Sequence, residues 1–317
     1  MYNPIFYDPI KFSALTKVFL SISVILFHVA WLSNAILIYI FFRNYHTSTT
    51  CYEKCICFLL FCELSWSFPF SVIYSYMLTR GESFGFEGCQ WTGPLLPLVC
   101  GMTIFAHGML AIERYFTIIL QKSMESKHFI ILSSIFVPIV GFLSFSPLFI
   151  GTGFVLNDKH YCYYNFKQTK NGGDVAILLV MFVTFFSLFG IIMYCYSKIY
   201  FTFVTKKSSD VKKNSTRDRL NSKIFYTCVT VVGCFTMSFS PLITTLVVQI
   251  LFNYEFPDVI NHLSTTISVF DCLLTPLCLV LLVPSYKQGF RKHVYDYKRS
   301  QNTSQNQLDA NGVDQTR

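Results

Sequence analysis

Charged residues are scarce in this chain of 317 residues: 13% are charged and 53% are hydrophobic. An ordinary soluble domain has about a quarter of its residues charged. A chain so poor in charge lacks the residues that would cover a water-facing surface, which argues against a soluble domain. Glycine and proline are also few, at 15 and 11, so collagen-like and disordered classes are excluded. The composition indicates an integral membrane protein.

Signatures of catalytic and metal sites are also missing. The sequence has no paired Asp motif. It also has no Ser and His residues placed to lie at the same depth in the membrane, where they could act together in catalysis. Cys55-Ile-Cys57 lacks a second ligand pair at the spacing of a zinc site. Basic residues lie in loops without base-stacking aromatics, so nucleic acid is not an expected partner. We therefore expect a protein that is not an enzyme, carries no cofactor and has no firm metal site.

Long apolar runs dominate the sequence instead. Seven of them reach the length of about 20 residues that a helix needs to cross a bilayer, and barrel strands would be shorter. The sequence thus predicts an all-α integral membrane fold, a bundle of seven transmembrane helices followed by a short amphipathic eighth helix. The expected segments are 1–17 outside, the bundle 18–283 with spans 18–42, 55–78, 89–120, 128–150, 174–204, 223–252 and 259–283, the amphipathic helix 284–298, and a disordered cytoplasmic tail 299–317.

The basic residues predict the orientation of these spans. If the amino terminus lies outside, the cytoplasmic segments hold nineteen of the 25 Lys and Arg residues and the outer segments hold six. Because basic residues favour the cytoplasmic side, we expect an extracellular amino terminus and a cytoplasmic carboxyl terminus at the plasma membrane. The net charge of +8 then reflects topology and contact with anionic lipid.

Ten of the twelve cysteines fall within the spans or on the cytoplasmic side. Only Cys89, at the outer start of the third span, and Cys162, between the fourth and fifth, face the oxidising side. We expect these two thiols to pair and to fix the 151–173 loop across the mouth of the bundle. The alternative is a pair of free thiols in mobile loops.

Ionisable residues at membrane depth mark functional candidates. The third span ends in Glu113-Arg114-Tyr115, and Arg114 follows Cys89 by 25 residues. This span resembles the third helix of the rhodopsin-like G-protein-coupled receptors, which starts with a bridged Cys and ends in an Asp/Glu-Arg-Tyr motif. Without that resemblance, Arg114 could be a charged anchor at the end of a helix.

Further residues match the same family in order and spacing. Asn34 and Glu63 stand where its first and second helices carry Asn and Asp, and Asp271 with Pro276 stands where the seventh carries a polar residue and Pro. The fifth and sixth spans are similar through Cys195, Tyr196, Phe235, Phe239, Ser240 and Pro241.

The sequence also departs from the usual family pattern. Leu188 replaces a Pro, Phe239 replaces a Trp, and Leu279 stands where the helix-seven switch has Tyr. The stretches IERYFTIILQKSMESKHF and PLCLVLLVPSYKQGFRK look more like the nematode serpentine chemoreceptors, especially their class-a-like superfamily. That resemblance implies a chemoreceptor, as in olfaction, in a sensory-neuron membrane and its cilium.

The resemblance implies a G-protein switch made of Glu113, Arg114, Tyr115 and Tyr196. Glu113 would hold the Arg114 guanidinium at rest, and opening of the bundle would release it toward the carbonyl groups of an inserted partner helix. In many relatives the Arg also binds an acid on helix six, but Asn221 and Lys223 occupy the nearby positions here. We therefore expect a loosely held resting state with measurable basal activity.

The same resemblance implies that Glu63 and Asp271 face each other inside the bundle. Two carboxylates in a low dielectric do not both stay ionised without a cation, so either one is protonated or a sodium ion lies between them. The alternative is a hydrogen-bonded acid that holds the helices together. His107 is interpreted as a packed, hydrogen-bonded imidazole rather than a metal ligand. Neutral ligands to an ion could come from Asn34, Ser65 and Ser268.

The same resemblance puts the ligand pocket in the outer half of the bundle, where the residues are apolar with a few hydroxyls. The third span has no Asp to hold an amine, and Val269 stands where an opsin carries its retinal-bearing Lys. A small lipophilic or volatile molecule is the expected ligand. The expected lining residues are Leu96, Pro97, Cys100, Trp66, Thr184, Phe239, Leu242, Ile243, Thr265 and Val269.

These patterns predict a G-protein-coupled receptor in a lipid bilayer. Its expected partners are a small-molecule ligand outside and a heterotrimeric G protein inside, with arrestin as a further one. The alternative is a transporter or channel that uses Glu63 and Asp271 as a cation or proton relay. Transporters usually have paired repeats and broken helices, and the sequence has neither.

Overall fold

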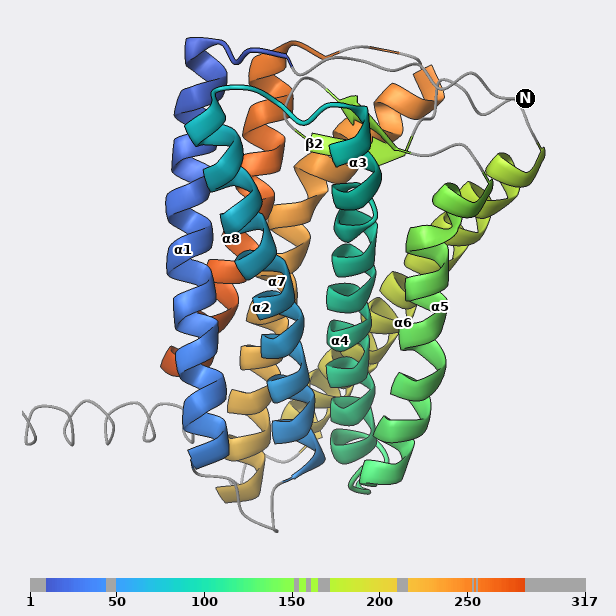
Figure 1. The fold of residues 1–317 in the computed structure, drawn as a ribbon. Helices are drawn as coiled ribbons and strands as arrows, with labels where there is room; N and C mark the ends of the chain where they lie inside the picture. Colours follow the sequence, from blue (N-terminus) through green and yellow to red (C-terminus); the bar gives the residue numbers. More distant parts are fainter. Residues whose placement is uncertain are drawn as a thin grey trace, which may run out of the picture.

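The computed structural model describes residues 10–43, 50–150, 154–157, 161–164, 172–209, 216–252, 254 and 256–282. Seven of its helices are long and apolar enough to cross a membrane, and they run side by side as one bundle (Figure 1). The elements are α1 (Ala14–Arg43), α2 (Cys51–Arg80), α3 (Phe86–Thr92), α4 (Leu95–Ile118), α5 (Ser126–Ile150), β1 (Phe154–Asn157), β2 (Tyr161–Tyr164), α6 (Gly172–Ser209), α7 (Thr216–Phe252) and α8 (Asp258–Leu282).

The predicted seven-helix membrane bundle is confirmed, with a small hairpin added. Strands β1 and β2 pair antiparallel, with Phe154 opposite Tyr164 and Leu156 opposite Cys162. The hairpin and α3 lie together at one end of the bundle (Figure 1). The predicted amphipathic helix 284–298 and the tail 299–317 lie outside the described residues, as do residues 1–9 of the amino-terminal segment.

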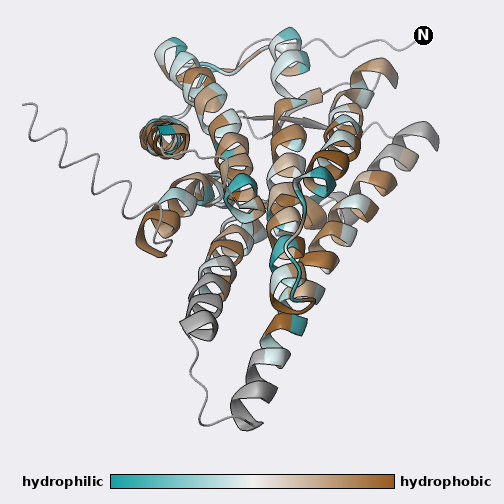
Figure 2. Cartoon of the chain, turned by 90° about the horizontal axis from the view of Figure 1, so that it is seen from below, coloured by the Kyte–Doolittle hydropathy of each residue, from teal (hydrophilic) through white to brown (hydrophobic). Residues whose placement is uncertain are grey.

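The outward face of the bundle is apolar because its surroundings are lipid. Large side chains such as Phe142 and Met237 are 68% and 76% exposed, a degree that would be costly in water. Hydrophobic colouring covers most of the length of the helices (Figure 2). Helices α5 and α6 carry the least buried spans, and α2 and α4 the most buried, so α2 and α4 position most of the interior side chains.

Helix α2 has clear start and stop signals. The Thr50 hydroxyl accepts from the Glu53 N–H at 3.3 Å while a Glu53 carboxylate oxygen accepts from the Thr50 N–H at 3.0 Å, which is a capping box. At the other end Gly81 adopts a left-handed φ of 71° and donates to the Met77 carbonyl. These caps fix the depth of every residue between them, including Glu63 and Trp66.

The predicted third span, 89–120, is divided between α3 and α4, but the backbone stays right-handed helical at Gly93 and Pro94, and Glu87–Ile118 forms one segment long enough to cross a membrane. Helix α3 ends at Thr92, and α4 begins after Gly93 and Pro94. Pro94 carries no N–H and starts the new helix, while a Cβ on Gly93 would collide with the Phe154 side chain. The absence of a side chain at Gly93 therefore lets the hairpin pack closely against the junction of α3 and α4.

Helix α4 is the central element. It packs against α2, α5, α6 and α7, while α8 packs against α1, α2 and α7. Side chains that α4 sends inward can therefore meet those of α2 and α8.

Candidate functional site

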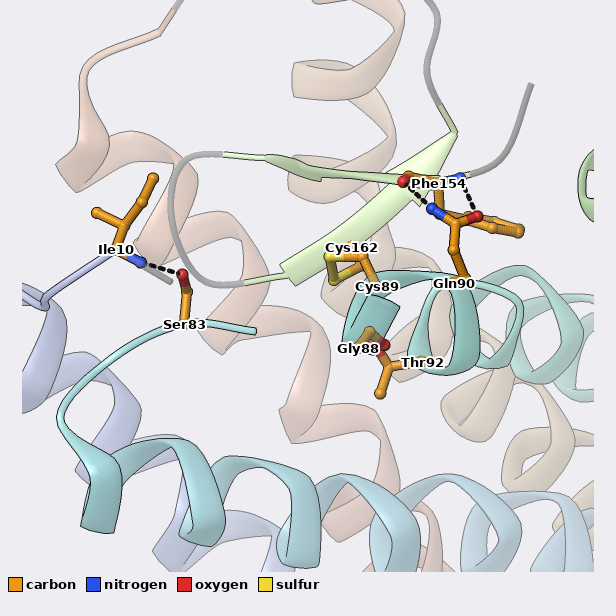
Figure 3. Close-up of a disulfide and its surroundings, with 8 residues drawn as sticks. All are labelled: Ile10, Ser83, Gly88, Cys89, Gln90, Thr92, Phe154 and Cys162. Atoms are coloured by element: carbon orange, nitrogen blue, oxygen red, sulfur yellow. Dashed lines mark hydrogen bonds between the residues drawn. A yellow bond between two sulfur atoms is a disulfide. The ribbon is translucent and has the colours of Figure 1, made fainter. Parts of the chain in front are cut away.

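A disulfide holds the hairpin at its end of the bundle. Cys89 in α3 is bonded to Cys162 in β2, with their Cα atoms 5.2 Å apart and a sequence separation of 73. The next residue, Gln90, binds the other strand: its amide donates to the Phe154 carbonyl at 2.7 Å and accepts from the Phe154 N–H at 3.0 Å (Figure 3). The structure contains the predicted disulfide, and α3 is tied to both strands of the hairpin.

The segment before α1 is tied to the same end. The Ile10 N–H donates to the Ser83 hydroxyl and the Ser83 N–H donates to the Ile10 carbonyl, both at 2.9 Å; Figure 3 shows the first of these bonds. The Phe12 N–H donates to the Gly81 carbonyl at 2.9 Å. These bonds fix the connection between α2 and α3, which contributes Phe84 to the cavity beneath.

A small cavity lies between the hairpin end and the middle of the bundle: the volume open to the centre of a water molecule is about 30 Å³, and all the empty space out to the open mouth is about 540 Å³. No charged residue lines it among the residues that the structure describes. Its walls come from α1, α2, α4, α7 and α8, together with α3, β2 and the α2–α3 connection. The lining residues are Phe27, Trp66, Phe70, Ile73, Tyr74, Met77, Phe84, Thr92, Leu96, Cys162, Leu242, Thr265, Ser268 and Val269.

The cavity contains half of the expected pocket residues. The residues that line it are Trp66, Leu96, Leu242, Thr265 and Val269. Those that lie outside its lining are Pro97, Cys100, Thr184, Phe239 and Ile243. The difference has a steric cause: the Phe239 ring meets the Trp66 ring at a centroid distance of 5.2 Å, which fills the space between α2 and α7. The cavity is therefore displaced toward α1, α2 and α8, and none of its lining residues comes from α6.

Most hydroxyl groups at the cavity wall already donate to their own helix. Thr92 donates to the Gly88 carbonyl at 2.9 Å, Thr265 to that of Asn261 at 2.9 Å, and Ser268 to that of Thr265 at 2.7 Å. Such hydroxyls can still accept a hydrogen bond but have no free proton to offer. The wall is thus suited to a mainly apolar molecule.

A row of aromatic rings leads from the cavity to the centre of the bundle. Trp66 contacts Phe239, Phe239 contacts Phe235 at 4.9 Å between centroids, and Phe235 contacts the His107 ring at 4.7 Å. All four side chains are at most 3% exposed. Packed rings transmit displacement because interiors are dense, so this row joins the cavity wall to His107.

Glu63, His107 and Asp271 meet at the middle of the bundle. One ligand atom from each lies within 4.8 Å of the others, and all three residues are 0% exposed. The expected approach of Glu63 and Asp271 is present, and His107 joins them. His107 is packed as expected, with its buried ring against Phe235, but the expected hydrogen bond is absent, because within the described part of the chain neither ring nitrogen has a partner.

Ser65 and Asn34, two of the neutral ligands expected near Glu63 and Asp271, differ in burial and in their hydrogen bonds. Ser65 is exposed and donates to the Phe61 carbonyl of its own helix at 2.8 Å, so its expected role as a ligand is wrong. Asn34 is buried, and its amide donates to the carbonyls of Ala30 and Cys272 at 2.9 and 3.0 Å. Asn34 therefore ties α1 to α8 next to Asp271.

The opposite end of the bundle holds the Glu113 and Arg114 ion pair. Both residues are buried, at 3% and 4% exposure, and the guanidinium is bonded to a Glu113 carboxylate oxygen. The other Glu113 oxygen accepts from the Thr117 hydroxyl at 2.9 Å. The Arg114 guanidinium carbon also lies 3.8 Å from the ring centroid of Tyr52 in α2, within the range of a cation–π contact. The charge is thus held by a carboxylate and by a ring that sequence reasoning missed.

The two other expected switch residues, Tyr115 of α4 and Tyr196 of α6, each contact an aromatic ring of another helix. The Tyr115 ring is 6.2 Å from the Tyr194 ring, and the buried Tyr196 ring is 6.3 Å from that of Phe225 in α7. The side chains of Asn221 and Lys223 lie outside the described residues, so the expectation about an acid on the sixth span stays a prediction.

A bundle of seven membrane-length helices with a cavity at one end and a buried ion pair at the other is typical of the seven-transmembrane receptors. The family model of the 7 transmembrane receptor (rhodopsin family) matches residues 33–280. The chain belongs to this family and is a G-protein-coupled receptor in a membrane that it crosses several times.

The solved structures show the same fold. The crystal structure of squid rhodopsin superimposes with a TM-score of 0.77 at 17% sequence identity, covering 92% of this chain and 84% of that one. At that identity the likeness extends to the fold alone. No curated protein matches the sequence significantly.

Proposed function

We propose that this receptor is a chemosensory receptor for a small, uncharged, lipophilic or volatile molecule. The observation that carries the proposal is the cavity beneath the hairpin, whose lining is uncharged and contains Phe27, Trp66, Phe70, Tyr74 and Phe84. Burial of apolar and aromatic area is the main source of affinity in such a site. An amine or a phosphate would find no counter-charge in this wall.

Tyr74 is the polar group best suited to orient such a ligand. Its side chain is 5% exposed, lines the cavity, and meets Phe27 and Phe70 at centroid distances of 5.6 and 5.9 Å. A phenol both donates and accepts, whereas Thr92 and Thr265 donate to their own helices. The favoured ligand therefore has a largely apolar body and one hydrogen-bond acceptor.

At the opposite end we propose that Glu113, Arg114, Tyr115 and Tyr196 form the surface for a heterotrimeric G protein, with arrestin as a second partner. The buried ion pair supports this proposal, because an ionised pair kept at membrane depth is costly. We further propose that the amino terminus is extracellular, that the cell type is a sensory neuron of the kind that carries nematode serpentine chemoreceptors, and that the receptor is placed in its cilium. The similarity of the stretches that contain Arg114 and Pro276 to those receptors supports the last two points.

The experiment is a ligand screen in a reporter cell that expresses the full chain and a promiscuous G protein. Among odorant-sized compounds we expect neutral lipophilic ones to activate it. Val269→Phe, which fills the cavity, should raise the half-maximal concentration at least tenfold, a loss of about 1.4 kcal/mol. Val72→Phe is the matched control, because Val72 is 55% exposed on α2 and lies outside the cavity lining.

Three outcomes would oppose the proposal. Activation by charged amines or acids alone would overturn the ligand class, and equal effects of the two Phe variants would overturn the cavity as the binding site. A ligand-evoked ion current without any G-protein response would favour the channel alternative that uses Glu63 and Asp271.

A further inference from the structure

Two free thiols meet between α7 and α8. Cys234 of α7 and Cys278 of α8 are hydrogen-bonded to each other through their side chains, and the two helices pack against each other. Both cysteines are outside the Cys89–Cys162 disulfide, and neither lines the ligand cavity. The receptor mechanism above therefore gives this thiol pair no role.

The two residues lie at a similar depth in the bundle. Cys234 comes 18 residues before Phe252, at the end of α7. Cys278 comes 20 residues after Asp258, at the start of α8. At a rise of 1.5 Å per residue these positions are about 27 and 30 Å along their helices from that shared end. A bond between them would join α7 to α8 in the half of the bundle that holds the Arg114 ion pair.

The surroundings of the thiol pair are apolar. Cys278 is 9% exposed, and Cys234 is half-buried and packs against the same small cluster of buried side chains. The other buried members of that cluster are Leu59, Cys62, Ala106 and Val231. Cytosolic thiols are kept reduced by glutathione, a charged tripeptide that does not enter an apolar interior. Small uncharged molecules can enter it, so the pair is open to some oxidants and shielded from the usual reductant.

The placement on two helices favours a disulfide. The thiols of Cys51 and Cys55 are also hydrogen-bonded, but these residues lie four positions apart on α2, where Cβ atoms are about 5–6 Å apart. A disulfide needs a Cβ separation of about 3.5–4.5 Å, which a regular helical turn does not provide. Cys234 and Cys278 escape this limit because their backbones belong to different helices.

We propose that Cys234 and Cys278 form an oxidation site, at which a hydroperoxide converts the two thiols into a disulfide between α7 and α8. The oxidant class comprises hydrogen peroxide and the organic hydroperoxides formed from unsaturated lipids. The more exposed Cys234 thiol attacks the hydroperoxide, the O–O bond breaks, and a sulfenic acid forms while water or an alcohol leaves. The Cys278 thiol then attacks the sulfenic sulfur, the S–S bond forms, and the S–O bond breaks with loss of water. Two electrons pass from the thiols to the hydroperoxide.

The setting also determines how fast the site responds. A thiol in apolar surroundings reacts slowly, because the thiolate is the nucleophile. The hydrogen bond between the thiols favours the second step, since it keeps the Cys278 sulfur beside the sulfur that is oxidised first. The site therefore responds to sustained exposure to hydroperoxide, as in peroxidised lipid, and not to a brief pulse.

The disulfide would hold the receptor at rest. Cys234 directly precedes Phe235, whose ring contacts that of His107 in the aromatic row. Helix α7 also packs against α4, which carries Arg114. A bundle that opens to admit a partner helix must move its helices apart, and a covalent bond from α7 to α8 opposes that movement. This effect on signalling rests on the proposed function, whereas formation of the disulfide does not.

The first test detects the bond itself in the unmodified receptor. Full-length receptor in nanodiscs is incubated with hydrogen peroxide or tert-butyl hydroperoxide, the remaining thiols are alkylated, and the peptides are analysed by mass spectrometry. We expect a cross-linked peptide pair that contains Cys234 and Cys278, absent before treatment and lost on mild reduction that leaves the Cys89–Cys162 disulfide intact. Absence of this pair after treatment, or a cross-link of either residue to Cys62 in its place, would overturn the proposal.

The second test measures agonist-stimulated release of GDP from a heterotrimeric G protein. Hydroperoxide should slow this release at least tenfold, and mild reduction should restore it. Cys234→Ala and Cys278→Ala should each make the receptor insensitive to the oxidant, whereas Cys57→Ala, which removes a free thiol outside the cluster, should leave it sensitive. Equal inhibition of Cys234→Ala and Cys57→Ala would overturn the regulatory role. If no agonist couples the receptor to a G protein, the proposed function fails, and the peptide analysis still decides the oxidation site.

Discussion

The guanidinium of Arg114 lies against the ring of Tyr52, with 3.8 Å between its central carbon and the ring centroid. Tyr52 is buried at the start of α2, and Arg114 is buried at the end of α4. The contact therefore joins two helices at the point where the receptor is expected to open. A cation–π contact of a desolvated guanidinium contributes about 2 kcal/mol, comparable to a good hydrogen bond to a charged group.

Removal of this ring should loosen the resting state. We expect Tyr52→Ala to raise ligand-independent G-protein activation several-fold in a reporter cell, because the Arg114 charge loses one of its two supports. Tyr52→Phe keeps the ring face and should stay near the unmodified level. Tyr39→Ala, at a tyrosine 54% exposed on α1, is the control; equal effects of Tyr52→Phe and Tyr52→Ala would contradict a role for the ring.

Neutralisation of Glu113 should have a larger effect than loss of the ring. Glu113→Gln leaves the buried guanidinium without its carboxylate, and a broken buried ion pair costs about 3–5 kcal/mol. We expect higher basal activation together with lower thermal stability of the receptor. Glu125→Gln is a suitable control, since the Glu125 pair with Lys127 at 2.7 Å is more than half exposed. Basal activation in Glu113→Gln equal to that of the Glu125 variant would count against the switch.

The disulfide should matter for the ligand-binding end. Its 73-residue loop corresponds to about 4 kcal/mol in the chain-entropy treatment. Cys89→Ser and Cys162→Ser should each lower surface expression and ligand response, and the double variant should add little, because one bond is lost in every case. Cys100→Ser removes a free thiol and should change neither. Additive losses in the double variant would show that the two cysteines act separately.

Two glycines provide a matched test of helix packing. A Cβ on Gly101 of α4 would lie 2.6 Å from a methyl carbon of Val140 in α5, whereas a Cβ on Gly141 would meet no atom within 4 Å. Gly101→Ala should therefore lower Tm, because overpacking costs about 1–3 kcal/mol. Gly141→Ala should leave it unchanged or raise it slightly, since alanine favours the helix by about 1 kcal/mol. Thermal unfolding of the purified receptor distinguishes the two, and a lower Tm for Gly141→Ala alone would contradict the packing.

The sequence was sufficient for the seven spans because apolar length decides a helix in lipid. It was also sufficient for the pairing of Cys89 with Cys162, since the predicted topology leaves only these two thiols on the oxidising side, and for the approach of Glu63 and Asp271, since the family resemblance aligns the helices in depth. The close approach of the Phe154 side chain to Gly93 was not predicted, because Phe154 lies in a distant segment.

The contacts of His107 and Tyr52 could not be predicted in the same way. Each depends on the rotation of a helix about its axis, and the apolar residues around α2 and α4 give little periodicity from which to read that rotation. The displacement of the cavity toward α1 has a similar origin, because it follows from the packing of the Trp66 and Phe239 rings. Such packing is a property of the assembled bundle.

The central claim is that a ligand in the cavity acts on a G protein through Arg114, and nucleotide exchange measures it most directly. The purified receptor, reconstituted in vesicles with a heterotrimeric G protein and an agonist from the screen, should accelerate the release of GDP at least tenfold, and Arg114→Ala should abolish that acceleration while agonist binding persists. An agonist that binds without any effect on exchange, or an acceleration that is undiminished in Arg114→Ala, would contradict the account.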